Sequence, residues 1–226
     1  MKYSALILSF LIFLSSASAR QNIDAKRFEH LSGIRKSSDP KVYWDKKYAQ
    51  ESYIFGKIPA KFLSANYHFI PAGAKVLDVG MGEGRNAVFL ARKGYNVVGV
   101  DISAVAVRKA KKLADEFGVR INTVVAPMQK FNPGKESYDA IICFYYVDRA
   151  LNKRLMEWLK PGGILIYESH SELQKTIPGN ENYDEAYLLK PGELLTMFKG
   201  YKVLKFEEPT HQGEFTASII VEKPRK

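Results

Sequence analysis

The chain has 226 residues, of which 46% are hydrophobic, 12% aromatic and 26% charged, and its formal net charge is +10. This composition excludes an intrinsically disordered chain and suffices for one domain with an apolar core. The basic residues are spread along the chain, and the one local run, 108–112, falls on the polar side of a helical pattern, so we expect no nucleic-acid binding. The single cysteine, Cys143, excludes an intramolecular disulfide; we expect it to be a buried apolar side chain, and we expect no metal site.

Residues 1–19 have the pattern of a secretion signal. Lys2 precedes an apolar run from Ala5 to Leu14, and Ala17 and Ala19 follow in an A-x-A cleavage pattern. The run is too short to span a bilayer comfortably, so we predict cleavage, export to the periplasm or the medium, and no membrane span in the mature chain. The alternatives are an uncleaved membrane anchor and a cytoplasmic protein.

A polar leader, residues 20–40, precedes a single predicted domain, residues 41–226. The domain opens with an aromatic-rich segment at 41–63. Its Tyr48, Tyr53 and Phe55 are expected either to pack on the first helix or to form a lid that contacts substrate, and Gly56 would let the lid bend.

From residue 75 onward, strand and helix patterns alternate. Strands are predicted at 75–80, 96–101, 121–125, 138–146 and 163–169, with helices at 85–94, 103–118 and 148–159. A helix at 191–198 and strands at 201–208 and 215–223 follow. This order predicts an α/β fold that is Rossmann-like and doubly wound, with a mostly parallel seven-stranded sheet and an antiparallel C-terminal strand. Ligands of such sheets bind beyond the carboxyl ends of the strands.

The first strand ends in a loop with glycines at alternate positions, Gly80, Gly82 and Gly84, after the acid Asp78. A dinucleotide loop needs a third glycine three residues after the second, where this chain has Arg85, and a phosphate-binding G-K-S/T is absent. A pyrophosphate is therefore the weaker match.

Asp101 ends the second strand, where a carboxylate can accept hydrogen bonds from both hydroxyls of a ribose. Asp78 can help to bind a cationic amino-acid tail, directly or through water. Together with the glycines, the two acids predict a loop that holds S-adenosylmethionine.

The stretch "VLDVGMGEGRNAVFLARKGYNVVGVDIS", 76–103, resembles the first two motifs of class I S-adenosylmethionine-dependent methyltransferases, and "YDAIICFYY" and "LKPGGILIYE" resemble their later strand motifs. The resemblance covers roughly 41–223, and "GEGRNAVFLA" with the segments around 43–63 and 188–208 is similar to the tellurite-resistance-type branch. The resemblance implies a methyltransferase that acts on a small molecule, such as a thiol or a chalcogen oxyanion. We expect the protein to be a monomer or a homodimer. The predicted cofactor-binding residues are Asp78, Gly80, Gly82, Gly84, Asp101, Ile102, Met128 and Phe144.

Two positions depart from the family pattern. The second loop residue is Met81, which should alter packing only. The third strand is followed by "VVAPMQ" instead of an acid that would bond the adenine amine, so stacking on Met128 or a hydrogen bond from Gln129 is the predicted substitute.

The catalytic residues are unknown from sequence, and the weak candidates are Tyr146 and His170. Methyl transfer to an anionic nucleophile needs no general base, whereas transfer to a protonated nucleophile would use a general base. Further acceptor-side candidates are Tyr145, Asp148 and Glu168, and each has a structural alternative: a core position for Tyr145 and Tyr146, a helix N-cap for Asp148, and a solvated loop for His170. Arg85 and Asn86 are either exposed first-turn residues or part of the cofactor loop.

Two other functional classes stay open at this point. One is an oxidoreductase that uses a nicotinamide dinucleotide. The other is an exported, non-catalytic nucleoside-binding module.

Overall fold

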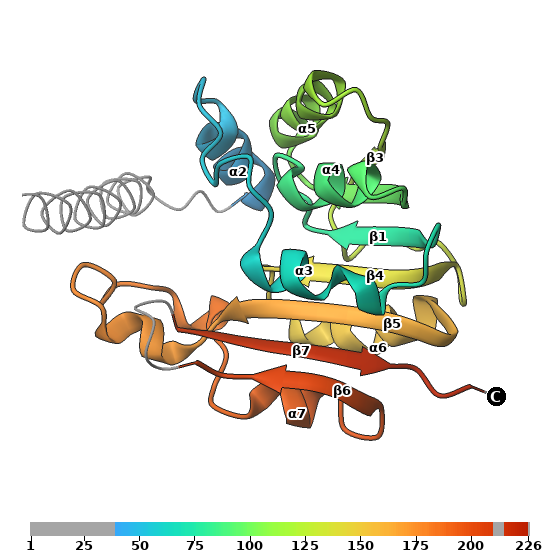
Figure 1. Ribbon diagram of the computed structural model, residues 1–226. Helices are drawn as coiled ribbons and strands as arrows, with labels where there is room; N and C mark the ends of the chain where they lie inside the picture. The colour runs from blue at the N-terminus through green and yellow to red at the C-terminus, as the bar shows by residue number, and fades with distance from the viewer. Residues whose placement is uncertain (1–38, 210–214, 226) are drawn as a thin grey trace, which may run out of the picture.

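The computed structural model describes residues 39–209 and 215–225 (Figure 1). The predicted signal at 1–19 and nearly all of the polar leader lie outside the described residues. In the described part of the chain, no helix is long and apolar enough to cross a membrane.

Seven strands form one sheet in the order β3-β2-β1-β4-β5-β7-β6. All neighbours from β3 to β5 pair in parallel, and β7 runs antiparallel to both β5 and β6. This confirms the predicted fold and the antiparallel C-terminal strand. The strands are β1 (Lys75–Val79), β2 (Asn96–Asp101), β3 (Asn122–Val125), β4 (Tyr138–Phe144), β5 (Leu159–His170), β6 (Lys202–Glu207) and β7 (Thr216–Glu222).

Helices cover both faces of the sheet, because successive strand residues point to opposite sides. Leu77, Ile141 and Leu165 join one apolar core with the side chains of α6 and α7, whereas Val76 and Ile142 join a second core with those of α3, α4 and α5. The helices are α2 (Pro40–Tyr48), α3 (Lys61–Asn66), α4 (Arg85–Arg92), α5 (Ala104–Glu116), α6 (Asn152–Trp158) and α7 (Glu193–Met197). Short 3₁₀ turns occupy Tyr67–Phe69, Arg149–Leu151, Glu172–Thr176 and Glu185–Tyr187.

Helix ends follow the sequence signals. Ser103 caps α5 by accepting a hydrogen bond from the Ala106 N–H, and Gly94 and Gly118 follow α4 and α5 with left-handed backbones. Asp39 caps α2, whose first residue is Pro40.

Several predicted boundaries were wrong, and β5 begins at Leu159 instead of residue 163. The strand predicted at 138–146 ends at Phe144, because Tyr145 turns into the left-handed region with φ 57°. The helix predicted at 148–159 begins as a 3₁₀ turn, becomes α-helical only at Asn152, and ends at Trp158. The carboxyl end of β4 is thus a bend rather than extended strand.

Candidate active site

The glycine loop connects β1 to α4, and all three glycines have positive φ: 64° at Gly80, 58° at Gly82 and 85° at Gly84. The structure shows what approaches each of them closely. A β-carbon at Gly84 would lie 2.7 Å from Cβ of Ala110 in α5, so this glycine serves helix packing. At Gly80 and Gly82 the close neighbours are the side chains of Tyr146 and Tyr48.

Met81 of the glycine loop is buried. Its Sδ fills the space above Gly99 of β2, where a β-carbon would lie 1.9 Å away. The departure at Met81 is therefore one of packing, as predicted.

The Asp101 carboxylate lies beside the glycine loop at the end of β2 and is buried. Its Oδ2 accepts a hydrogen bond from the Gly82 N–H at 2.8 Å, and its Oδ1 accepts one from the Ser103 N–H at 2.8 Å. Burial raises the pKa of Asp101, and the backbone donors oppose that effect. Each carboxylate oxygen can accept a second bond, so the fixed carboxylate can still receive hydroxyl donors.

Asp78 is buried in β1, the strand that neighbours β2 and its Asp101, and the Oδ2 atom of Asp78 has no hydrogen-bond partner among the described residues. Burial, and then the charge of Asp101, raises the pKa of Asp78 to about 8, while Arg85 acts in the opposite direction. An orphaned buried carboxylate oxygen fits a site in which a bound cation supplies the missing partner.

The aromatic segment is fastened over the loop by polar contacts. Lys109 of α5 donates to the carbonyl oxygens of residues 48, 50 and 52 at 3.3, 2.9 and 2.7 Å, and it forms an ion pair with Glu83 of the glycine loop. Glu83 in turn accepts a hydrogen bond from the Ile54 N–H at 2.7 Å. A loop residue and a helix residue thus hold the chain between α2 and α3 against the site.

The first turn of α4 adds two further contacts to that segment. Asn86 is buried and its Oδ1 accepts a hydrogen bond from the Ala60 N–H at 2.9 Å. The Arg85 guanidinium donates to the Phe55 carbonyl at 3.1 Å and lies 5.4 Å from the ring centre of Tyr145. Of the two alternatives for Asn86, the exposed first-turn residue is excluded, because its buried side chain binds the segment before α3.

Of the predicted lid aromatics, Tyr48 reaches the loop. It stacks on Trp44 and packs on Ala106, while its hydroxyl lies 3.0 Å from the β-carbon position of Gly82. Burial, followed by the charges of Asp101 and Glu83, raises the pKa of Tyr48 well above its usual range. Tyr53 instead donates to the Lys109 carbonyl at 3.1 Å, and Phe55 is partly exposed with its ring edge-to-face on Tyr48.

The bend after β4 carries the acceptor-side candidates. Cys143 is a buried core residue, as expected, and its Sγ lies 3.3 Å from the Tyr146 carbonyl. The Tyr167 hydroxyl donates to the same carbonyl at 2.8 Å, which leaves the Tyr146 ring against Gly80. Asp148 is an N-cap, since it accepts a hydrogen bond from the Ala150 N–H, and it also binds the Gln129 amide at 2.9 Å.

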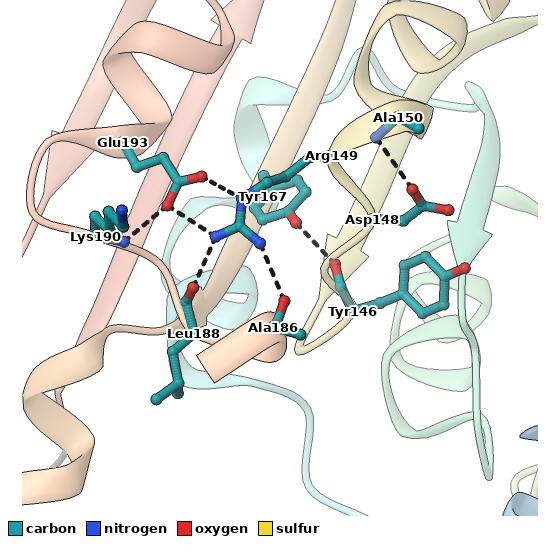
Figure 2. A network of polar contacts seen from close by, with 9 residues as sticks. All are labelled: Tyr146, Asp148, Arg149, Ala150, Tyr167, Ala186, Leu188, Lys190 and Glu193. Atoms are coloured by element: carbon teal, nitrogen blue, oxygen red, sulfur yellow. Dashed lines mark hydrogen bonds and ion pairs between the residues drawn. The ribbon is translucent and has the colours of Figure 1, made fainter. Parts of the chain in front are cut away.

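Figure 2 shows how this bend is anchored to the segment before α7. Arg149 donates to both carboxylate oxygens of Glu193 at 2.5 and 3.0 Å, and to the carbonyls of Ala186 and Leu188 at 3.0 and 2.8 Å. Glu193 also accepts a bond from the Lys190 N–H at 2.8 Å. One guanidinium therefore joins two segments that lie far apart in sequence.

Glu168 and His170 lie at the end of β5. Glu168 is buried and accepts hydrogen bonds from the hydroxyls of Tyr145 at 3.0 Å and Ser218 at 2.7 Å, so it is a structural partner. The His170 ring lies between Tyr145 and Tyr183, with centroids 4.8 and 5.7 Å away, and is not a solvated loop residue. Burial, and then the charge of Arg85, lowers the pKa of His170 to about 4.

The predicted adenine contacts lie mostly in the core. Met128 and Phe144 are buried, each in a different apolar core, and Ile102 is half-buried beside Asp101. The Gln129 amide is engaged by Asp148. The contacts of these residues with the cofactor stay predictions.

A cavity of about 390 Å³ lies near the Arg149 network, and no residue of the glycine loop lines it. It is lined by Arg149, Glu172, Leu173, Lys175, Glu185, Leu188 and Lys190. In the described part of the chain no group of three or more histidine, cysteine or acidic residues is placed to hold a metal ion.

The comparisons with known proteins agree with this geometry. Residues 76–163, which run from β1 into β5, match the model of a family described as a methyltransferase domain. This match supports a class I S-adenosylmethionine-dependent methyltransferase domain over these residues. The cofactor of this family is S-adenosylmethionine, and the predicted tellurite-resistance-type branch stays a prediction.

Two curated relatives are methyltransferases. The ubiquinone biosynthesis O-methyltransferase of Rickettsia canadensis is 29% identical over 143 residues, which are 54% of this chain and 59% of the relative. The tRNA 5-carboxymethoxyuridine methyltransferase of Escherichia coli is 31% identical over 132 residues, which are 53% of this chain and 51% of the relative. The chain thus spans about half the length of the curated relatives it matches.

Two solved structures share the fold. One comes from work on the conversion of a disulfide bond into a thioacetal group during echinomycin biosynthesis, with a TM-score of 0.65, 22% identity, and coverage of 82% of this chain and 93% of that chain. The other is TehB from Haemophilus influenzae, with a TM-score of 0.58, 20% identity, and coverage of 81% and 66%.

Some site residues were missed from the sequence. Lys109 belongs to a run that was interpreted as a solvated helix face, yet it carries the contacts that hold the aromatic segment. Arg149 and Glu193 were also missed, because they are 44 residues apart and no local pattern links them.

Proposed function

We propose that the protein transfers the methyl group of S-adenosylmethionine to a small-molecule acceptor that carries a thiol, a chalcogen oxyanion or an oxygen nucleophile. The observation that carries this proposal is the buried Asp101 carboxylate, fixed by the N–H groups of Gly82 and Ser103 beside a loop of left-handed glycines. When bound, the cofactor supplies a methyl group on a positively charged sulfur.

The residues present fit that group. Asp101 would accept the ribose hydroxyls, and the orphaned oxygen of Asp78 would face the cationic amine. Tyr48 and the fastened segment 48–60 would shield the site from water, which strengthens electrostatic interactions inside it. The Tyr146 ring, held by the bonds to its carbonyl, would shape the space above Gly80.

The distribution of charge supports a small acceptor rather than a nucleic acid, although one relative is a tRNA methyltransferase. Many basic side chains are paired with acids. These pairs join Lys41 to Asp45, Lys57 to Glu116, Lys109 to Glu83, Arg149 to Glu193, Lys160 to Asp139 and Lys175 to Glu185. Such mixed surfaces are typical of soluble enzymes rather than of a phosphate-binding stripe.

The test is calorimetric titration of the full chain with S-adenosylmethionine, S-adenosylhomocysteine and NADH, followed by an acceptor screen that includes tRNA and measures released S-adenosylhomocysteine. We expect binding of the first two ligands only. Asp101→Ala should weaken that binding by about 1.5–3 kcal/mol, because it removes charge-assisted hydrogen bonds. Binding of NADH alone would replace this proposal by the dinucleotide alternative, and cofactor binding without turnover of any acceptor would favour the non-catalytic module.

We also propose that the protein is exported, with the signal at 1–19 cleaved. N-terminal sequencing of the protein from its natural source should then begin at Arg20. A chain that begins at Met1 would contradict cleavage.

A further inference from the structure

The end of β5 and the first turn of α4 bring together two polar groups that the proposed function does not use. The first is the Nδ1 atom of His170, which is buried and has no hydrogen-bond partner among the described residues. An unsatisfied polar atom in such a place costs free energy unless a ligand completes it.

The second is the Arg85 guanidinium. It is half-buried, and the structure gives it one hydrogen bond, to the Phe55 carbonyl, and no carboxylate within ion-pair distance in the described part of the chain. A partly desolvated guanidinium without a carboxylate partner retains donors for a planar oxyanion.

Both groups lie against the ring of Tyr145. Its ring centre is 5.4 Å from Cζ of Arg85 and 4.8 Å from the ring centre of His170. The ring is itself fixed, because its hydroxyl donates to buried Glu168 and its backbone is held at φ 57°.

Resting on the proposed function, we infer that Arg85 and His170 form a two-point site for an acceptor that carries an oxyanion and a hydroxyl or thiol. Arg85 binds the oxyanion, and Nδ1 of His170 accepts a hydrogen bond from the hydroxyl or thiol. His170 acts as a positioning residue, because its ring is held between Tyr145 and Tyr183 and its unpartnered Nδ1 orients the donor.

The experiment measures binding to the full chain saturated with S-adenosylhomocysteine, so that no turnover is needed. Two matched pairs are titrated: mercaptopropionate against mercaptopropanol, and meta-hydroxybenzoate against meta-hydroxybenzamide. We expect at least one carboxylate compound to bind about ten-fold or more tightly than its neutral partner, because a charge-assisted contact is formed. Equal binding within both pairs, or no binding of any of the four at millimolar concentration, would overturn the inference.

Arg85→Gln should remove that preference while S-adenosylhomocysteine binds as before, and Arg85→Lys should restore part of it. His170→Phe keeps a ring between the two tyrosines and should weaken both members of the preferred pair without abolishing the preference. Arg92→Gln, on the same helix and outside the site, is the control and should change nothing.

If Arg85→Gln instead weakens S-adenosylhomocysteine, the guanidinium serves the cofactor carboxylate and the inference is wrong. If the wild-type chain binds no S-adenosylhomocysteine, the proposed function itself has failed. The two failures are therefore distinguishable.

Discussion

The ring of Tyr146 lies against the backbone of Gly80, so that a β-carbon at residue 80 would stand 2.9 Å from the Cδ2 atom of the tyrosine. The backbone of Tyr146 is held in place because its carbonyl accepts a hydrogen bond from the Tyr167 hydroxyl. The glycine loop and the bend after β4 thus share one packed contact at the candidate site.

Gly80→Ala should destabilise the fold by about 2–3 kcal/mol, because it adds a left-handed alanine and a clash with the Tyr146 ring. In a Tyr146→Ala background the clash is absent, so the same change should cost about 1 kcal/mol less. Urea unfolding of the two single variants and the double variant measures this coupling. An identical cost in both backgrounds would show that the ring does not press on residue 80.

Gly84→Ala tests a different role for a glycine of the same loop. Its β-carbon would lie 2.7 Å from Cβ and 3.0 Å from Cα of Ala110, and a helix backbone cannot move aside as a side chain can. We expect a loss of about 3 kcal/mol or more. Gly118→Ala is the matched control, because φ is 65° there and nothing lies within 4 Å of the new carbon; it should cost only about 1–2 kcal/mol. Thermal unfolding that shows equal losses would contradict the packing role.

Lys109→Met should loosen the aromatic segment over the site. The change removes three hydrogen bonds to carbonyls and leaves the Glu83 carboxylate buried without its cation, at an expected cost of about 2–4 kcal/mol. Hydrogen exchange should become faster at the Ile54 amide, which Glu83 binds. Lys111→Met, an exposed position on the same helix, is the control. Unchanged exchange across 48–56 would mean that Lys109 is not what holds the segment.

Asp78 should make the fold less stable as the pH rises. Its folded pKa of about 8 lies above the value of about 3.9 in an unfolded chain, so the folded state binds more protons between these two values. The free energy of unfolding therefore falls from about pH 4 to about pH 8. Asp78→Asn cannot titrate, so its slope should be flatter and it should be more stable than the wild type near pH 8 by about 1 kcal/mol or more. Urea unfolding at several pH values measures this; the exposed Asp115→Asn should follow the wild type.

The sequence predicts those parts of the fold that repeat locally. The alternation of apolar strands and capped helices predicted the mostly parallel sheet correctly. Ser103 and Gly94 also marked helix ends correctly. The bend at Tyr145 could not be predicted, because its positive φ is imposed by contacts from β5 and not by a local turn residue.

The candidate site divides in the same way. Asp78, the glycines and Asp101 lie within 24 residues and were recognised by their spacing, and the structure places them together. The partners that complete the site come from distant segments, such as Lys109, which donates to the Gln50 carbonyl, and His170, which packs against Tyr145. Alternation likewise could not decide whether Tyr146 faces the core or the site, because its position depends on the bonds to its carbonyl.

Binding of the cofactor should release a proton from Asp78 near neutral pH. Below about pH 8 the free protein holds this carboxyl mostly protonated, whereas a cationic amine beside its orphaned Oδ2 favours the ionised form. At pH 7 the release should approach about one proton per cofactor bound, and it should fall as the pH rises through 8, where the carboxyl becomes ionised in the free protein. Calorimetric titration with S-adenosylmethionine in phosphate and in Tris measures the release, because the observed enthalpy shifts with the ionisation enthalpy of the buffer. Asp78→Asn should give the same enthalpy in both buffers, and a wild-type enthalpy that ignores the buffer would mean that the amine does not bind at Asp78.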